Sequence, residues 1–168
     1  MHWLVDGYNV IRRGPELAER ERESLEAGRQ ALCRLLSTAA RVSGDRFTVV
    51  FDGNRGGGSF SAGPGVHVMF SSARETADRV LARTATAGAA VVSNDQEVRQ
   101  AAARAGAIAI TADQFLSRLR RADRVSGSES GPEKDDEETI RPQNKKGNPR
   151  RLSKKDRLAA RALGRLAR

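Results

Sequence analysis

The amino-acid sequence predicts an α/β fold with a mainly parallel sheet. Over the first 122 residues, short apolar runs recur that are mostly unbroken by polar residues, as in strands buried on both faces. Between these runs lie segments with apolar residues at helical spacing, and capping residues mark several of their ends. Strands that alternate with helices are typical of a parallel sheet, and the sequence contains no internal repeat.

Five apolar runs are the predicted strands. They are residues 3–5 (WLV), 47–51 (FTVVF), 66–70 (VHVMF), 89–93 (AAVVS) and 107–110 (AIAI). Four segments between and after them are the predicted helices: residues 24–41, 73–87, 95–105 and 112–121. Two helix starts fit a capping box, Ser72 with Glu75 and Asn94 with Glu97.

The charge divides the chain into three parts. The whole sequence has 30 Lys and Arg against 21 Asp and Glu, a formal net charge of +9 that favours polyanions such as nucleic acid as partners. Residues 1–122 form the predicted ordered domain, and residues 123–140 are acidic and poor in apolar residues, as in a disordered linker. Residues 141–168 form a basic tail that is predicted to become helical on contact with a polyanion. A merely solubilising tail is the alternative.

Cysteine content and hydropathy exclude several protein classes. The single cysteine, Cys33, rules out an internal disulfide, and its neighbours predict a small buried hydrophobic residue. No spacing of Cys and His resembles a zinc site. The first residues lack the pattern of a signal peptide, and no apolar run approaches the length of a membrane span. We therefore expect a cytoplasmic protein with no membrane partner.

Four aspartates are predicted to meet at one edge of the sheet. Asp6, Asp52 and Asp95 each come at the end of a predicted strand, where ligands of parallel sheets bind. Asp78 lies one turn into the helix that follows residues 66–70 and can face the same edge. Two carboxylates about 4 Å apart repel each other by about 4 kcal/mol at an effective dielectric constant near 20. Such a cluster therefore requires a cation.

Oxygen ligands of this kind are typical of Mg²⁺ or Mn²⁺ rather than zinc. Divalent cations held by carboxylates activate water and neutralise charge on a phosphodiester, so phosphodiester hydrolysis is the chemistry that fits. Asn9 follows Asp6 by three residues and can orient a ligand through its amide, as can Ser93 and Asn94.

Structural roles are the alternative for each of these acids. Asp6, Asp52 and Asp95, each taken alone, are typical helix caps or turn formers. Asp78 alone can be an ordinary surface residue, and Glu75 can pair with Arg79 one turn along the helix. The coincidence of four acids at one edge of a basic protein favours the functional interpretation.

The glycine-rich residues 52–65 do not form a known phosphate-binding motif. No P-loop lysine follows them, and their spacing fits no dinucleotide-binding pattern. They are interpreted as a mobile loop beside Asp52 that admits or clamps a nucleic-acid strand, with Arg55 available for phosphate. A plain flexible connection is the alternative.

Four motifs resemble those of a known family. "LVDGYNVI", "VVFDG", "ETADRV" and "VVSND" follow in the order and approximate spacing of the NYN domain, a branch of the PIN-like nucleases, and are most similar to its YacP-like bacterial members. The resemblance covers about residues 1–122. It implies a three-layer α/β/α domain with a mainly parallel central sheet and a Mg²⁺- or Mn²⁺-dependent endoribonuclease. The acidic positions of the family carry over to the four aspartates, with Asn9 as their polar companion.

The leading hypothesis is an endoribonuclease that uses Asp6, Asp52, Asp78 and Asp95 as metal ligands and catalytic residues together with Asn9. The predicted substrate-binding residues are Asn9, Asn94, Arg55, Lys145, Lys146, Arg150 and Arg151. The expected partner is RNA, whether mRNA, rRNA or tRNA, with the ribosome as a further candidate. The alternative is a non-catalytic RNA- or ribosome-binding adaptor with the same fold. A phosphatase of the HAD type, with Asp6 as nucleophile, is disfavoured because its second aspartate is replaced by Tyr8.

Overall fold

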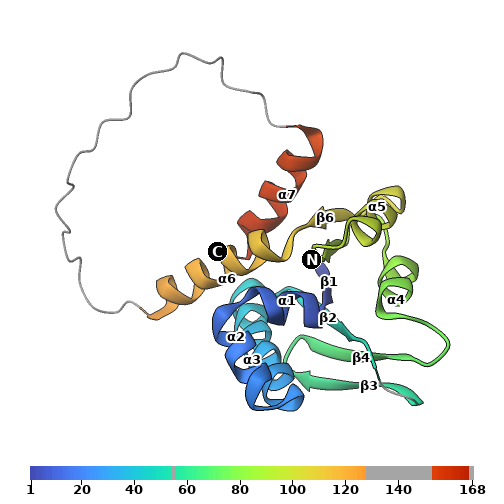
Figure 1. The fold of residues 1–168 in the computed structure, drawn as a ribbon. Coiled ribbons are helices and arrows are strands. Elements are labelled where there is room, and N and C mark those ends of the chain that lie inside the picture. Colours follow the sequence, from blue (N-terminus) through green and yellow to red (C-terminus); the bar gives the residue numbers. More distant parts are fainter. Residues whose placement is uncertain (54–55, 128–152, 167–168) are drawn as a thin grey trace, which may run out of the picture.

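A computed structural model describes residues 1–53, 56–127 and 153–166 of the chain (Figure 1). Six strands form one sheet in the order β3-β4-β2-β1-β5-β6, and every neighbouring pair is parallel except β3 and β4. The strands are β1 (His2–Asp6), β2 (Arg46–Phe51), β3 (Gly56–Gly63), β4 (Val66–Ser72), β5 (Ala90–Val92) and β6 (Ile108–Ile110). The predicted α/β fold with a mainly parallel sheet is confirmed.

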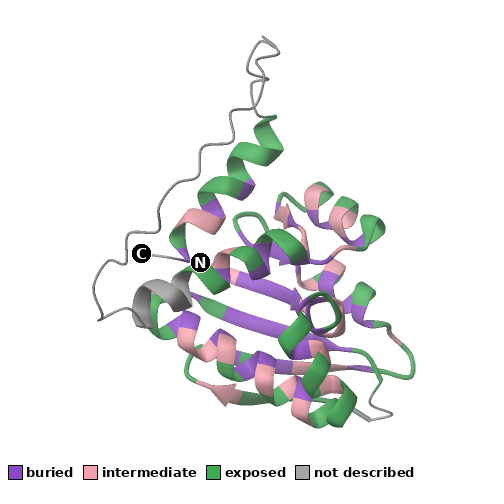
Figure 2. Cartoon of the chain, turned by 60° about the vertical axis from the view of Figure 1, so that its left-hand side comes forward, coloured by how far each residue is buried: buried purple, intermediate pink, exposed green. Residues whose placement is uncertain are grey.

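Helices cover both faces of the sheet. They are α1 (Gly7–Arg13), α2 (Pro15–Glu23), α3 (Leu25–Ser43), α4 (Ala77–Thr84), α5 (Gln96–Arg104), α6 (Ala112–Gly127) and α7 (Lys154–Arg165). On one face, Trp3 and Val5 of β1 share a buried cluster with residues of α1, α2, α3, α6 and α7. On the other face, Leu4 packs with α4 and α5. Figure 2 shows the buried strands between these helix layers.

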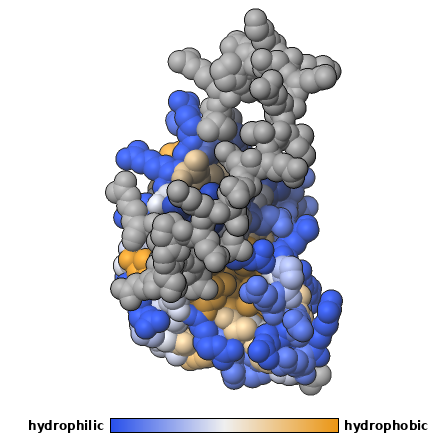
Figure 3. All heavy atoms as spheres, turned by 90° about the vertical axis from the view of Figure 1, so that its left-hand side faces the viewer, coloured by the Kyte–Doolittle hydropathy of each residue, from blue (hydrophilic) through white to orange (hydrophobic). Residues whose placement is uncertain are grey.

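The central strand β1 explains why the apolar runs lack alternation. Residues Trp3, Leu4 and Val5 are all fully buried, since one face of β1 packs on each helix layer. Cys33 lies on α3 and is buried as predicted, and burial raises the pKa of its thiol to about 11. On the outer surface, seen from the side of α2 and α6, hydrophilic residues surround a smaller hydrophobic area (Figure 3). Within the described ranges, no helix is both long and apolar enough to cross a membrane.

The glycine-rich stretch differs from the predicted loop. Residues Gly56–Gly63 form strand β3, which pairs antiparallel with β4 at the edge of the sheet. Gly63 at the end of β3 and Gly65 of the turn that follows have φ angles of 143° and 71°, in the left-handed region that favours glycine. This strand consists mainly of glycine and serine, so it carries no apolar pattern that predicts a strand. Ser59 and the one aromatic residue, Phe60, are both exposed at the edge of the sheet. Helices α1 and α2 were also not predicted from the sequence.

Both predicted capping boxes are wrong. Helix α4 begins only at Ala77, and the hydroxyl oxygen of Thr76 accepts a hydrogen bond from the N–H of Arg79. Ser72 instead ends β4 and forms a bridge with Glu75. Helix α5 is capped by the carboxylate of Asp95 rather than by Asn94. In both cases a neighbouring Thr or Asp is the better-placed cap, and the amide of Asn94 bonds elsewhere.

Helix α7 packs on the rest of the domain. Ala159, Ala162 and Leu166 belong to the same buried cluster as Trp3. The guanidinium of Arg118 on α6 donates to the carbonyl oxygens of Leu163 and Gly164 at 2.8 and 3.2 Å. Whether the basic tail of residues 141–168 binds a polyanion stays a prediction. Its packing on the domain was not predicted from the sequence, because small residues carry much of it.

The predicted acidic linker lies mostly outside the described residues. Helix α6 continues to Gly127, and the next described residue is Ser153, which caps α7. The boundary after residue 122 stays a prediction.

Helix α7 is expected to contribute to the stability of the domain. Leu166, which directly follows α7, is fully buried, and Leu158 on α7 is 42% exposed. Leu166→Ala should therefore lower the free energy of unfolding by about 2–5 kcal/mol. Leu158→Ala should change it by less than about 0.5 kcal/mol. Urea denaturation of both variants measures this difference, and equal stabilities would mean that α7 does not pack on the domain in solution.

Candidate functional site

A cleft of about 740 Å³ lies where the carboxyl ends of β1, β2 and β5 meet. Six residues singled out in the sequence line it: Asp6, Asn9, Asp52, Asp78, Asn94 and Asp95. Five other predicted phosphate-binding residues, Arg55, Lys145, Lys146, Arg150 and Arg151, lie outside the described residues. The sheet thus gathers four carboxylates and two amides from distant segments of the chain.

Asp6 occupies the junction between β1 and α1. Its Oδ1 accepts a hydrogen bond from the backbone N–H of Asn9 at 3.2 Å, and its Oδ2 accepts one from the hydroxyl of Ser93 at 3.0 Å. Burial raises the pKa of Asp6, and the negative charges of Asp78 and Asp95 raise it further, while the two hydrogen bonds oppose the shift. The carboxylate is fixed in position but is costly to ionise without a nearby positive charge.

Gly7 allows the helix to start directly after Asp6. A Cβ atom at this position would lie 2.2 Å from Cε1 of Phe51, closer than two carbon atoms can approach. Phe51 is the last residue of β2 and precedes Asp52, so close packing here brings the ends of β1 and β2 together. The glycine in "LVDGYN" is therefore required by a close approach, since its φ angle is not positive.

Ser93 links two of the aspartates. Its side chain is fully buried, donates to Asp6 and accepts a hydrogen bond from the backbone N–H of Asp95 at 3.0 Å. One hydroxyl therefore connects the end of β1 with the start of α5.

Asp95 caps helix α5, the structural role that an aspartate at the end of a strand also predicts. Its Oδ1 accepts hydrogen bonds from the N–H groups of Glu97 and Val98 at 2.6 and 3.1 Å. Its Oδ2 has no hydrogen-bond partner among the described residues, and the side chain lines the cleft. A carboxylate with two oxygens can cap a helix and still present one oxygen to a ligand.

Asp52 and Asp78 complete the set of carboxylates. The Oδ1 of Asp52 accepts a hydrogen bond from the hydroxyl of the buried Ser71. Asp78 lies in the first turn of α4. Its pKa is raised by partial burial, then by the charges of Asp95, Asp52 and Glu97. The repulsion between Asp78 and these neighbouring carboxylates indicates that their charges lie close together.

The two asparagines have different surroundings. Asn94 donates from its amide nitrogen to Asp113 at 2.9 Å and accepts the N–H of Ala112 at 2.8 Å, so both ends of its amide hold the start of α6. Asn9 accepts the backbone N–H of Asn94 at 3.1 Å through Oδ1. The amide nitrogen of Asn9 makes no hydrogen bond within the described part of the chain, so it is available to a ligand in the cleft.

Arginines border the cleft without neutralising its acids. Arg12 and Arg13 line the cleft, but Arg12 pairs with Glu21 at 3.4 Å and lies over the ring of Tyr8. Across residues 1–53, 56–127 and 153–166, none of the four aspartates forms an ion pair with an arginine or lysine. Their negative charge therefore remains available to a cation.

The donor set fits a hard divalent cation. The described residues contain no group of three or more Asp, Glu, His or Cys side chains placed closely enough to hold a metal ion together. Mg²⁺ is often held by only one or two carboxylates, with water and substrate phosphates as its other ligands. Carboxylates without ion-pair partners around a cleft, with the pKa values of Asp6 and Asp78 raised, are compatible with this mode of binding.

Sequence reasoning missed two groups of residues that border the site. Ser71 follows Phe70 as Asp52 follows Phe51, and Phe51 and Phe70 are paired in the parallel register of β2 and β4. In this register, the residue that follows Phe70 lies beside the residue that follows Phe51. A parallel alignment of the two apolar runs could therefore have predicted that Ser71 lies beside Asp52. Arg12 and Arg13 follow Asn9 by three and four residues, which puts them on the same face of a helix once α1 is recognised.

Known proteins match both the sequence and the fold. Residues 3–166 match the YacP-like NYN domain, well beyond the segment 1–122 in which the resemblance was found. The uncharacterized protein YacP of Bacillus subtilis (strain 168) is 34% identical over 86 residues, which are 50% of this chain and 51% of that protein. The match thus spans about half the length of this curated relative.

Solved structures extend the similarity over most of the chain. A mutant form of Rae1 (YacP) from Bacillus subtilis has a TM-score of 0.62 and 26% identity, covering 79% of this chain and 86% of that one. A second crystal structure of Rae1 (YacP) has a TM-score of 0.60 and 27% identity, covering 75% and 79%. The chain therefore belongs to the family of YacP-like NYN domains.

Proposed function

We propose that this protein is a metal-dependent endoribonuclease that hydrolyses phosphodiester bonds of RNA. The observation that carries the proposal is the meeting of Asp6, Asp52, Asp78 and Asp95 in one cleft, without any described ion pair to balance them. Membership of the NYN family supports a nuclease-type hydrolase. The net charge of +9 supports a polyanionic substrate.

The proposed roles follow from the contacts of each residue. Asp6 and Asp78 would hold Mg²⁺ or Mn²⁺, with Asp52 and the free oxygen of Asp95 as further ligands directly or through water. Such an ion, when bound, lowers the pKa of a water molecule and neutralises charge on the phosphodiester. Asn9 orients the phosphodiester or a water molecule through its unbonded amide nitrogen.

Other residues position this set. Ser93 and Ser71 hold the carboxylates of Asp6 and Asp52 by hydrogen bonds. Asn94 was predicted to bind substrate, and its bonds to Asp113 and Ala112 support a positioning role instead. The basic residues of the tail would add affinity for RNA that does not depend on its sequence.

Loss of either of two carboxylates is expected to abolish most activity. Asp6→Asn and Asp78→Asn each remove a negative charge with little change in shape, and each should lower the rate of RNA cleavage by about 100-fold or more. The measurement is cleavage of a labelled single-stranded RNA with Mg²⁺ or Mn²⁺. Glu19→Gln, which removes an exposed carboxylate from α2, is the matched control and should retain full activity.

Thermal unfolding separates the possible outcomes of this experiment. Mn²⁺ should raise the melting temperature of the unsubstituted protein and should raise that of the two Asn variants much less. Equal cleavage by all variants would show that the site is assigned wrongly. RNA binding without any cleavage by the unsubstituted protein would favour the adaptor function.

Activity is expected to decline at acid pH. Burial raises the pKa values of Asp6 and Asp78, and only their ionised forms attract a cation. As the pH falls through these values, protonation should release the ion, so the acidic limb of kcat/KM should have its midpoint above the ordinary aspartate value of about 3.9. A pH profile at subsaturating Mn²⁺ measures the midpoint. A rate that stays constant down to about pH 4 would contradict the proposed role.

Ser93→Ala should move this acidic limb. The hydroxyl of Ser93 stabilises the ionised form of Asp6, so its loss should raise the pKa of Asp6 and shift the midpoint upward by about one pH unit. Ser59→Ala, at an exposed position of β3, is the control and should leave the profile unchanged. An unshifted midpoint in Ser93→Ala would mean that Ser93 does not set the ionisation of Asp6.

A further inference from the structure

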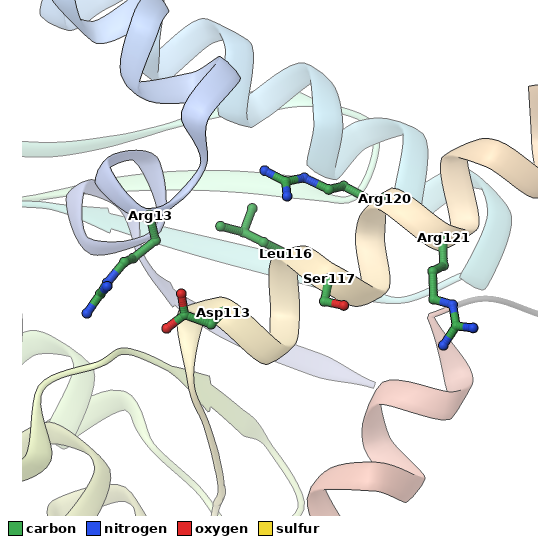
Figure 4. Close-up of a pocket in the computed structure, with 6 residues that line it drawn as sticks. All are labelled: Arg13, Asp113, Leu116, Ser117, Arg120 and Arg121. Carbon is green, nitrogen blue, oxygen red and sulfur yellow. The ribbon is translucent and has the colours of Figure 1, made fainter. Parts of the chain in front are cut away.

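A second groove adjoins the cleft along helix α6. Its volume is about 330 Å³, and it is lined by Arg13, Asp113, Leu116, Ser117, Arg120 and Arg121. Figure 4 shows Arg13 of α1 at one end of this groove and Arg121 at the other, with Arg120 extending along it beside Leu116. None of the predicted functional residues lies in this groove, so the aspartate site does not account for it.

The groove follows one face of α6 and continues the cleft. Its five residues from α6 are spaced by three, four, seven and eight positions from Asp113, which places them along one side of the helix. At a rise of 1.5 Å per residue, this stripe is about 12 Å long. Arg13 lines both the groove and the cleft, so a single extended ligand can occupy the two together.

The groove has the opposite charge to the cleft. Arg13, Arg120 and Arg121 are exposed, and none of them forms an ion pair within the part of the chain that the structure describes. The carboxylate of Asp113, the one acid in its lining, accepts a hydrogen bond from Asn94. Three arginines and one aspartate give the lining a formal charge of +2. The four aspartates and two arginines of the cleft give −2.

Guanidinium groups are well suited to phosphate. Their planar arrangement of N–H donors matches two phosphate oxygens at once, and an arginine keeps its charge at all physiological pH values. Ser117 adds an exposed hydroxyl donor between the arginines, and Leu116 is buried in the core beneath them. This combination fits a sugar-phosphate backbone better than it fits a small anion, because the positive charges are spread along the helix.

We infer that this groove binds the sugar-phosphate backbone of the RNA strand next to the phosphodiester that is cleaved. The inference rests on the proposed function, since it assigns a path to the substrate of that site. The cation in the cleft would neutralise the phosphate that reacts, and Arg13, Arg120 and Arg121 would bind phosphates that follow it along the strand. The contact is independent of base sequence, because phosphates carry no sequence information.

The salt dependence of binding tests the inference. Binding of a single-stranded RNA of about twelve nucleotides is measured by fluorescence anisotropy in EDTA, so that neither cleavage nor a bound metal affects the result. The variant Arg120→Gln/Arg121→Gln should bind more weakly at low salt. The slope of log K against log salt concentration should fall by about 0.7 for each lost phosphate contact, and so by about 1.4 for the pair.

Two further variants control for charge and for folding. Arg41→Gln/Arg104→Gln removes the same charge from exposed positions of α3 and α5 and should bind with nearly the slope of the unsubstituted protein. Arg120→Lys/Arg121→Lys keeps the charge and should retain most of the slope. Thermal unfolding is recorded for each variant, so that a loss of fold is distinguished from a loss of contacts.

The outcomes separate this inference from the proposed function. If Arg120→Gln/Arg121→Gln binds RNA with the same affinity and salt slope as the unsubstituted protein, the groove does not bind the RNA backbone, even if the protein cleaves RNA. An equal loss in Arg41→Gln/Arg104→Gln would also overturn it, because net charge alone would then explain the binding. If the expected slopes are found but the protein never cleaves RNA, the groove binds RNA and the proposed endoribonuclease activity is wrong.

Discussion

The parallel pairing of β1 with β2 and β5 is the constraint on which the rest of the site depends. Strand β1 lies in the middle of the sheet, with Val5 opposite Val49 on one side and Val92 on the other. Because all three strands run in the same direction, the residues that follow them emerge at one edge. Asp6, Asp52 and Asp95 therefore meet although they lie far apart along the chain. The same pairing buries both faces of β1 and so joins the stability of the core to the geometry of the cleft.

The cleft combines hydrogen bonds that favour ionised aspartates with surroundings that oppose ionisation. Ser93 and the N–H of Asn9 stabilise the carboxylate of Asp6, whereas burial and the charges of Asp78 and Asp95 have the larger and opposite effect on its pKa. A capping role alone does not explain why other carboxylates lie so close to Asp6, because a capping aspartate needs no acidic neighbours. A divalent cation would neutralise the repulsion between these carboxylates. The arginines of the groove along α6 supply positive charge next to the cleft.

The sequence was most informative where the physical cause is local or where burial is complete. Runs such as 3–5 and 47–51 predicted strands because both faces are covered, and the acids that follow them were found from strand direction alone. Strand β3 could not be predicted, since its glycines and serines are held by pairing with β4 at an exposed edge. The caps of α4 and α5 were misassigned because Thr76 and Asp95 compete with suitable neighbours. Long-range contacts, such as those of Ser93 with Asp6, leave no periodic signal in the sequence.

The position of α7 has a consequence for how the chain folds. Leu166 packs in the same cluster as Trp3, so two segments from opposite ends of the described chain complete one core. Contacts of such sequence separation require the closure of a long loop, which slows folding relative to local helix formation. During synthesis, the earlier strands and helices emerge first and can collapse, but their apolar surface stays partly uncovered until α7 has been made. The nascent domain therefore presents apolar surface to chaperones and proteases until α7 has left the ribosome.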